Sequence, residues 1–335
     1  MALLSRTAPY VLVVAVMCAG FFVDMPHPYH GRKPAPIDAA SLARFPPFPA
    51  NLTGPYEKND LLAKHAVRLL EGQVHGAESV AVAPDGTLLM LDKYAWLHRA
   101  RQQEPRAAEA AVEYTLLGAA QGVEPLYIGP GRPLGYHVVE NGTALVVCDS
   151  VKGLLWVHLK TGAITVLANR AHTTSGPQLG ATSRGGAINY ANDLDVVSGE
   201  DAISEVYFSS STAGTVSLHA AGFYDTMRSF LLNMCCGDHT GRLLRFSPST
   251  GKTQELVSGL WYANGVEVSH DKESVLVVET MGFRVVQYWL KGEMRGRTTT
   301  LIDSLPGFPD GISKSSDGNY WCACILCNRD RSIRL

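Results

Sequence analysis

Four short segments of the chain vary one pattern, in which a Glu, Asn or Asp stands just before a short apolar run. The oxygen-bearing residues are Glu78, Asn192, Asn264 and Asp310, and no thiol or imidazole accompanies them. Carboxylate and amide oxygens are the hard ligands that Ca²⁺ prefers. Residues this far apart in sequence meet at one axis only if the chain forms a ring of repeats. The pattern therefore predicts a ring of repeats with a calcium site at its centre.

Each of these segments opens a strand–turn–strand unit. The pairs Asp85-Gly86 and Asn141-Gly142 are typical turns of β-hairpins between such strands. Further hairpins over 154–167 and 243–256 complete two of the units, and two hairpins make a four-stranded blade. Equivalent positions (78, 134, 192, 264 and 310) lie 56, 58, 72 and 46 residues apart, which is typical of a propeller with loop insertions. We therefore predict an all-β propeller.

Insertions and the C-terminus depart from this regular pattern. Residues 213–240 form the largest insertion, and its apolar stretch 220–236 predicts a helix over one face of the molecule. Residues 107–118 are expected to hold a brief helix. Five blade starts are visible, and the eleven residues after 324 are too few for a sixth. Because propellers protect their edges by closing the ring, the last blade is predicted to be truncated.

The N-terminal region differs from the rest of the chain. Residues 8–23 are an almost uninterrupted apolar run preceded by Arg6, which predicts a signal anchor or signal peptide over 1–23. Residues 24–60 are rich in proline and predict an extended linker, and 61–335 form the propeller. The chain is thus expected in the secretory pathway. An uncleaved leader makes it a type II membrane protein with a lumenal or extracellular propeller, and a cleaved one makes it secreted.

Charge and cysteine content bear on partners and compartment. The formal net charge is -2 and no cluster of Lys or Arg is present, so nucleic-acid binding is not expected. Asn51 and Asn141 stand in sequons and are predicted glycosylation sites, although Asn141 serves equally well as a turn residue. Six cysteines remain outside the leader, which permits disulfides whose pairing the sequence leaves open.

A Ca²⁺ ion at the propeller axis can have either a catalytic or a structural role. It can polarise a carbonyl or phosphoryl oxygen and activate water, or it can simply neutralise the polar ends of the blades. Hydrolysis also needs a base, but the equivalent position in the second unit is Leu134. His137 and His239 could each reach this face of the propeller, but a lone histidine is more often a surface or loop residue. Asp193, directly after Asn192, is the better-placed candidate for the catalytic base.

Several motifs together resemble the strictosidine synthase-like family, in particular its adipocyte plasma membrane-associated protein branch. The motifs are 131–135 (GRPLG), 190–194 (YANDL), 206–210 (VYFSS), 241–244 (GRLL), 264–266 (NGV) and 305–310 (LPGFPD). The resemblance covers about residues 65–324. It implies a six-bladed β-propeller, an N-terminal signal anchor and kinship with calcium-dependent paraoxonase and gluconolactonase-type hydrolases. It also implies that the family's chain continues by about another blade.

Carried over residue by residue, the resemblance makes Glu78, Asn192, Asn264 and Asp310 the calcium ligands. Leu134 replaces the paraoxonase-type catalytic histidine, and Gly311 stands where a further ligand often follows Asp310. The catalytic Glu of strictosidine synthase is expected beyond the end of this chain. We therefore predict a calcium-dependent hydrolase of small-molecule esters or lactones. The alternatives are a non-catalytic propeller with a structural ion that binds a ligand or partner, and strictosidine-type condensation.

Overall fold

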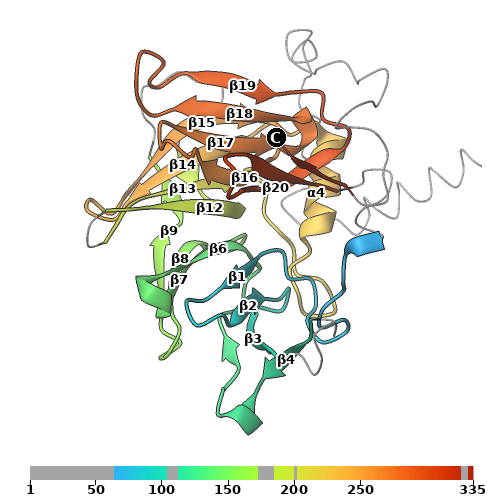
Figure 1. Ribbon diagram of the computed structural model, residues 1–335. Coiled ribbons are helices and arrows are strands. Elements are labelled where there is room, and N and C mark those ends of the chain that lie inside the picture. Colours follow the sequence, from blue (N-terminus) through green and yellow to red (C-terminus); the bar gives the residue numbers. More distant parts are fainter. Residues whose placement is uncertain (1–63, 104–111, 173–184, 200–201, 326–330, 335) are drawn as a thin grey trace, which may run out of the picture. The chain divides into compact units, whose positions relative to one another are not determined.

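The computed structural model (Figure 1) describes residues 64–103, 112–172, 185–199, 202–325 and the backbone of 331–334. The chain divides into two compact units, Met1–Pro34 and Ala35–Leu335, and every described residue belongs to the second. The predicted leader, the linker and Asn51 therefore lie outside the described residues. Within the described ranges, no helix has the length and apolar character needed to span a membrane.

Five antiparallel sheets follow one another along the chain, and each begins with its innermost strand. The first contains β1 (Val80–Val82), β2 (Leu88–Leu91), β3 (Trp96–Gln102) and β4 (Tyr114–Leu117), with β5 (Leu126–Tyr127) also paired to β3. The second contains β6 (Pro133–Val139), β7 (Ala144–Asp149), β8 (Gly153–His158) and β9 (Ile164–Ala168). The third contains β12 (Ala191–Ser198), β13 (Ile203–Ser210), β14 (Gly241–Ser247) and β15 (Lys252–Leu260).

The fourth sheet contains β16 (Ala263–Val268), β17 (Ser274–Glu279), β18 (Arg284–Trp289) and β19 (Thr298–Ile302). The fifth contains β20 (Phe308–Lys314), β21 (Tyr320–Ile325) and β22 (Arg331–Arg334). A small sheet pairs β10 (Arg170–Ala171) with β11 (Gly186–Ala187). These strands confirm the predicted hairpins and the predicted all-β propeller, whereas the truncation of the last blade stays a prediction.

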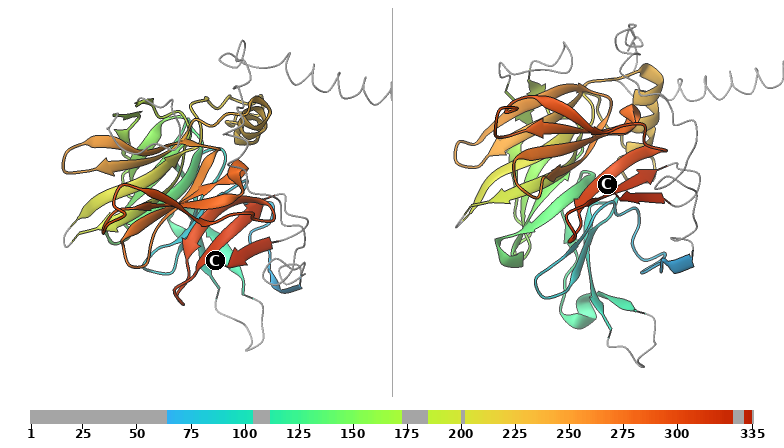
Figure 2. Two further views of the ribbon diagram at one scale, coloured as in Figure 1. Left: turned by 90° about the horizontal axis from the view of Figure 1, so that it is seen from above. Right: turned by 45° about the horizontal axis from the view of Figure 1, so that its top comes forward.

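The apolar core of the described residues is divided between neighbouring blades. One buried cluster lies between each successive pair of blades, from the first and second to the fourth and fifth. The inner strands β1, β6, β12, β16 and β20 are neighbours in that order. Figure 2 shows the sheets fanned in chain order, with the inner strands toward the centre. Burial between successive blades explains why the strands are rich in Val, Leu and Ile.

A β-bulge recurs at the same place in four inner strands. The register shifts between Pro133 and Tyr136, and the same shift occurs in β12, β16 and β20. The bulged pairs are 134–135, 192–193, 264–265 and 310–311. A bulge leaves its residues out of the strand ladder and turns a side chain toward a new direction. In these four strands the bulge therefore frees the first bulged residue from the ladder near the start of the strand.

The large insertion contains an α-helix. Helix α4 (Thr226–Cys236) begins where the Asp225 side chain accepts a hydrogen bond from the Arg228 backbone N–H at 2.9 Å, and it ends at Gly237 with φ 61°. An N-cap aspartate and a C-terminal glycine are the expected helix boundaries. This confirms the helix predicted within 220–236.

The helix predicted within 107–118 is wrong for its described part. Tyr114–Leu117 is strand β4, which pairs with β3 along the outer edge of the first blade. The alanine-rich stretch before it favoured a helix in the sequence. Here the tertiary pairing with β3 and the β-favouring residues Tyr114 and Thr115 prevail over that local propensity.

Candidate functional site

The four residues predicted to bind a metal line one cavity of about 370 Å³. Glu78 stands just before β1, whereas Asn192, Asn264 and Asp310 are the first bulged residues of β12, β16 and β20. The structure therefore brings together all four, although they span more than two hundred residues of sequence. The full lining is Gly76, Ala77, Glu78, Arg132, Tyr190, Asn192, Thr226, Met227, Phe230, Tyr262, Asn264, Asp310 and Ile325.

Both asparagines are oriented by hydrogen bonds from their amide groups. The Asn192 side-chain N–H donates to Ser211 Oγ at 2.9 Å, and Asn192 Oδ1 is buried without a hydrogen-bond partner. Asn264 donates to Thr280 Oγ1 at 3.1 Å and also to Asp310. With both amide protons engaged, the carbonyl oxygen is what Asn264 can offer to the cavity. A buried carbonyl oxygen without a donor is costly unless a ligand satisfies it.

The two carboxyl groups sit in a site that is short of positive charge. Burial, with the neighbouring Asp310 carboxylate, raises the pKa of Glu78 to about 8, and Arg132 opposes this shift. Glu78 is exposed to solvent through the cavity that it lines. Protein surrounds this cavity on several sides. Burial also raises the pKa of Asp310, against the hydrogen bond from Asn264. A bound cation would relieve this unfavourable burial of carboxylates.

Asp193, the predicted base, lies next to the cavity but is not part of its lining. Its Oδ2 accepts a hydrogen bond from the Val266 backbone N–H at 3.0 Å, which ties β12 to β16. A Cβ atom at Gly135 would meet the Asp193 carboxylate, so this carboxylate also packs against β6. Burial raises the pKa of Asp193 to about 7, and the Val266 N–H opposes the rise.

The walls of the cavity come from residues that sequence reasoning missed. Tyr190 and Tyr262 stand two positions before Asn192 and Asn264, and Tyr262 donates its hydroxyl proton to Tyr190 at 2.7 Å. Arg132 occupies the same position before Leu134 and is the only cation in the lining. The sequence offered one signal for these three residues, because each stands two positions before the first bulged residue of an inner strand. No such signal marked Met227 and Phe230, because α4 reaches the cavity through tertiary packing.

Arg132 is buried beside the carboxylates and held by backbone carbonyl groups. Its Nη1 donates to the Gly76 carbonyl at 3.1 Å and to the Pro133 carbonyl at 3.4 Å. Its side chain is 8% exposed. Leu134, the residue at the equivalent position of the second inner strand, is 2% exposed and packs in the apolar cluster beneath α4. The second blade thus contributes a cation and no oxygen ligand.

The histidines weighed as bases lie away from the cavity. His239 stacks on Trp261 with ring centres 5.1 Å apart. His137 belongs to a second polar layer further along the inner strands, where its Nε2 lies 3.7 Å from Asp195 Oδ1. Lys314 Nζ lies 3.0 Å from Asp195 Oδ2 and 2.5 Å from Glu267 Oε1. We call these four residues the channel tetrad: His137, Asp195, Glu267 and Lys314.

The donor set fits a hard cation such as Ca²⁺. Glu78 and Asp310 supply carboxylate oxygens, and Asn192 and Asn264 supply amide oxygens, one of which is buried without a partner. Among the described residues, no group of three or more His, Cys, Asp or Glu side chains is arranged to hold a metal. The four-residue set relies on two asparagines, so it belongs to a different class of site from such clusters.

These features define a β-propeller whose inner strands present oxygen ligands to an axial cavity. Residues 192–293 match the family model for strictosidine synthase. The chain is 27% identical over 346 residues to the protein STRICTOSIDINE SYNTHASE-LIKE 3 of Arabidopsis thaliana, covering 98% of this chain and 77% of that protein. It is 32% identical over 283 residues to the adipocyte plasma membrane-associated protein of Salmo salar, covering 82% of this chain.

These matches confirm the predicted resemblance to strictosidine synthase-like proteins, and the successive antiparallel sheets of the chain have a propeller fold, as that family does. A solved structure, the gluconolactonase XC5397 from Xanthomonas campestris, matches with a TM-score of 0.51 and 16% identity. The match covers 76% of this chain and 72% of that one, and it supports the fold alone. The chain spans only 59% of the length of the salmon relative.

Proposed function

We propose that this protein is a calcium-dependent hydrolase of esters or lactones. The observation that carries the proposal is the convergence of Glu78, Asn192, Asn264 and Asp310 on one cavity, with a buried Asn192 Oδ1 that has no donor. These four residues would hold the ion. A bound Ca²⁺ supplies a Lewis acid that polarises a carbonyl oxygen and lowers the pKa of water.

The remaining side chains give the cavity its substrate properties. Tyr190, Tyr262 and Phe230 form an aromatic wall, and Phe230 and Tyr262 meet edge to face with ring centres 5.2 Å apart. Such a wall suits the apolar part of an ester or lactone. Tyr190 also donates to the Thr226 carbonyl at 3.4 Å, which fixes α4 above the wall. The helix shields one side of the cavity from water.

Asp193 remains the proposed base, and a water molecule is the alternative. Since the Asp193 carboxylate is not in the cavity lining, its action on substrate requires a water to relay the proton. The charge on Asp193 would also favour a cation held by the neighbouring Asn192 and Asp310. Replacement by Asn keeps an acceptor for the Val266 N–H and removes only the charge and the basicity.

A protein of similar fold supports the proposal. The Xanthomonas protein is described as a gluconolactonase, and a lactone is an internal ester, so a similar fold does carry this chemistry elsewhere. A second candidate function is a non-catalytic propeller that binds a ligand or partner around a structural ion. Leu134 and the position of Asp193 favour that alternative. Strictosidine-type condensation rests on the family match alone.

We also propose that the protein enters the secretory pathway and contacts the membrane through its N-terminal segment. The name of the salmon relative, adipocyte plasma membrane-associated protein, supports this localisation. Asn141, a proposed glycosylation site, lies in the turn between β6 and β7 and is exposed, as an acceptor site requires, while its φ of 52° is typical of a turn asparagine. A glycosidase shift that is lost in Asn141→Gln would test it.

The test of the proposed activity is hydrolysis of aryl esters and lactones by the full chain, with added calcium and with a chelator. We expect activity that depends on calcium and falls at least about tenfold in Asn192→Ala. Asn319→Ala, in an exposed turn of the fifth blade, is the matched control and should retain full activity. If Asp193 is the base, Asp193→Asn lowers kcat by about 10²–10⁴-fold.

Two results would contradict the proposal. Activity that neither the chelator nor Asn192→Ala changes would exclude a metallohydrolase. Absence of activity, together with a chelator-sensitive melting temperature, would favour the structural ion. An Asp193→Asn variant with normal kcat would assign the base role to water instead.

A further inference from the structure

A second cavity, of about 400 Å³, lies between the third and fourth blades. It is at the opposite end of β12 and β16 from the candidate metal site, because Val197 and Val268 near the ends of these strands line it. We call it the cationic groove, since four cations and no carboxylate line it. The lining is Val197, Tyr207, Arg245, Gln254, Leu256, Val268, Lys272, Tyr288, Trp289, Leu290, Lys291 and Arg295.

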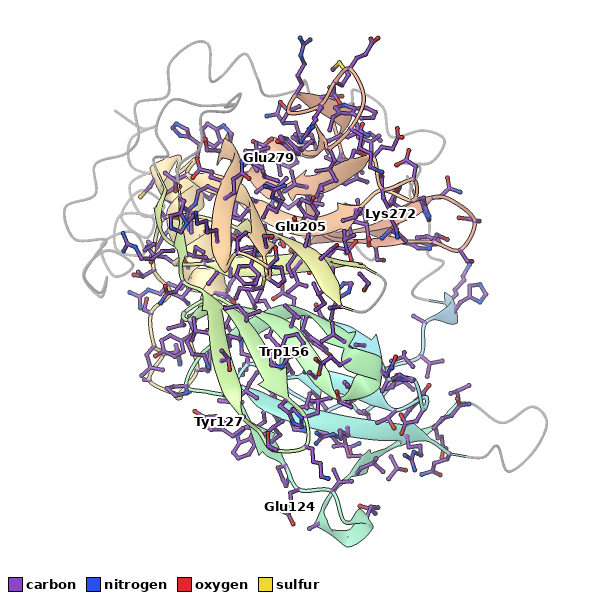
Figure 3. The ribbon with its side chains drawn as sticks, turned by 90° about the vertical axis from the view of Figure 1, so that its left-hand side faces the viewer. Glu124, Tyr127, Trp156, Glu205, Lys272 and Glu279 are labelled. Atoms are coloured by element: carbon purple, nitrogen blue, oxygen red, sulfur yellow. The ribbon has the colours of Figure 1, made fainter. Side chains whose placement is uncertain are left out.

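The charges of the groove are only partly neutralised. Arg245 Nε lies 3.7 Å from Glu205 Oε2, so this carboxylate offsets part of its charge, and Arg245 also donates a hydrogen bond to Gln254. Lys272, Lys291 and Arg295 are exposed, and none makes an ion pair with a carboxylate of the described residues. Figure 3 labels Lys272 and Glu205 within this part of the molecule.

The carboxylate of the nearby Asp271 forms hydrogen bonds within its own turn. Its carboxylate accepts hydrogen bonds from Ser269 Oγ at 2.5 Å and from the Glu273 backbone N–H at 2.9 Å. These bonds lower the pKa of Asp271, with a smaller effect of Lys291. The carboxylate therefore stabilises the turn that carries Lys272 and does not line the groove. The positive charge of the groove stays available to a ligand.

Backbone hydrogen bonds hold the cationic turns in place. The Leu290 N–H donates to the Glu273 carbonyl at 2.8 Å, which joins the turn of Lys272 to the segment of Lys291. The Gly296 N–H donates to the Trp289 carbonyl at 2.8 Å and closes the turn that carries Arg295. A binding site whose backbone is already fixed loses little entropy on binding.

The floor of the groove is apolar and aromatic. Tyr207, Tyr288 and Trp289 line it together with Leu256 and Leu290. Burial raises the pKa of Tyr288, and Arg245 and Arg295 oppose that rise, so both guanidinium groups act on this hydroxyl. The neutral phenol is then a hydrogen-bond donor beside two cations. A ligand here needs an anionic group and an apolar or planar body.

We propose that the cationic groove binds the phosphate group of a phosphomonoester with an apolar or aromatic body. A dianion matches several converging cations better than a single carboxylate does, and Arg binds phosphate oxygens in a bidentate manner. The body of the ligand would lie against Tyr207, Tyr288 and Trp289. Such a group occurs both in small metabolites and in the lipid phosphatidic acid, so the experiment separates these sources.

The test is titration calorimetry of the full chain with phenyl phosphate, and sedimentation with phosphatidylcholine vesicles with and without phosphatidic acid. We expect saturable binding of phenyl phosphate that weakens about tenfold in Arg295→Gln, the loss of one charge-assisted contact. Arg297→Gln is the matched control, because it lies in the same turn but outside the lining, and it should change affinity less than about twofold. Inorganic phosphate should bind more weakly than phenyl phosphate.

The outcomes assign or exclude the site. Binding of phenyl phosphate alone assigns a soluble ligand. Binding of phosphatidic acid vesicles, lost in Arg295→Gln, assigns the lipid headgroup as the source. No binding of either probe, or binding that Arg295→Gln and Arg297→Gln weaken equally, overturns the proposal. Circular dichroism of both variants checks that each is folded.

Discussion

In two of the four bulges, the second bulged residue decides how closely two neighbouring inner strands approach. A Cβ atom at Gly135 would lie 2.7 Å from Asp193 Cα and 3.0 Å from the Asn192 carbonyl oxygen. At Gly265 the same atom would lie 2.6 Å from the Ile312 backbone nitrogen. Real Cβ atoms do not come this close, so glycine is required by close backbone approach at these two positions.

Gly135→Ala is therefore expected to destabilise the protein by about 1–3 kcal/mol, the usual cost of overpacking a rigid site. Urea unfolding followed by circular dichroism measures the change. Gly311→Ala is the matched control, because Gly311 is the equivalent bulged residue of β20 and a Cβ there meets nothing within 4 Å. Equal loss of stability in both variants would show that the bulge itself, and not the packing, requires glycine.

At the scale of single residues, the sequence predicted which four oxygen-bearing residues meet at one cavity, but it did not predict that Asp193 lies outside the lining. Glu78, Asn192, Asn264 and Asp310 could be found because a propeller repeats one position in every blade. Asp193 could not be placed, because a bulge interrupts the alternation of side chains that normally tells which face a strand residue occupies. Its bond to the Val266 N–H depends on a strand 73 residues away.

The inner strands are joined to one another by side chains as well as by apolar packing. Asp195 Oδ2 accepts a hydrogen bond from the Val268 N–H at 2.9 Å, and Glu267 Oε2 accepts one from the Lys314 N–H at 3.0 Å. Each carboxylate thus satisfies a backbone donor of the next blade. Burial and the hydrogen bond with Asp195 raise the pKa of Glu267 to about 8, while that of Asp195 is lowered.

This arrangement predicts a pH dependence of stability. Glu267 holds its proton more tightly when folded, so its contribution is complete below about pH 4.5 and is lost as pH rises through about 8. Glu267→Gln keeps an acceptor for the Lys314 N–H but cannot ionise. Relative to wild type, the variant should gain stability steadily between about pH 5 and pH 8, as measured by thermal unfolding.

The charges of the other channel tetrad residues also influence the pKa values in this layer. Lys314 favours the ionised form of Glu267, and burial lowers the pKa of His137 against the effect of Asp195. Glu293→Gln, an exposed turn carboxylate, serves as the control and should follow wild type. A stability difference between Glu267→Gln and wild type that stays constant over this range would show that Glu267 is ionised throughout.

Element types were predictable where the pattern was long and regular. The hairpins of the blades and helix α4 were found from turn pairs and an apolar stretch. Strand β4 was missed because four residues at a sheet edge carry too little periodicity to outweigh a neighbouring alanine-rich stretch. The blade order and the location of α4 above Tyr190 and Tyr262 required tertiary packing, which no local pattern contains.

At the scale of the whole molecule, the ion would connect four of the blades. Glu78, Asn192, Asn264 and Asp310 come from the first, third, fourth and fifth blades, so a bound cation stabilises the folded ring and not the unfolded chain. At calcium concentrations about 100-fold above Kd, this contributes about 2.7 kcal/mol. We expect the melting temperature to rise by roughly 5 °C or more, as scanning calorimetry would measure.

The same experiment with Asn192→Ala separates a specific ion from a general salt effect. The variant should lose most of the calcium-dependent rise, whereas magnesium should have a smaller effect on wild type because it demands stricter geometry. An equal rise in the variant and in wild type would contradict the assigned ligands.

The repeated bulge also bears on how such a protein can change over generations. In β12, β16 and β20 the first bulged residue lines the cavity and takes no part in the strand ladder, so its exchange alters the ligand set without disturbing the pairing of the blade. Leu134, at this position of the second blade, shows that an apolar residue is tolerated there. Binding chemistry and ring architecture are therefore inherited through separate positions, and one scaffold can acquire or lose an ion while keeping its fold.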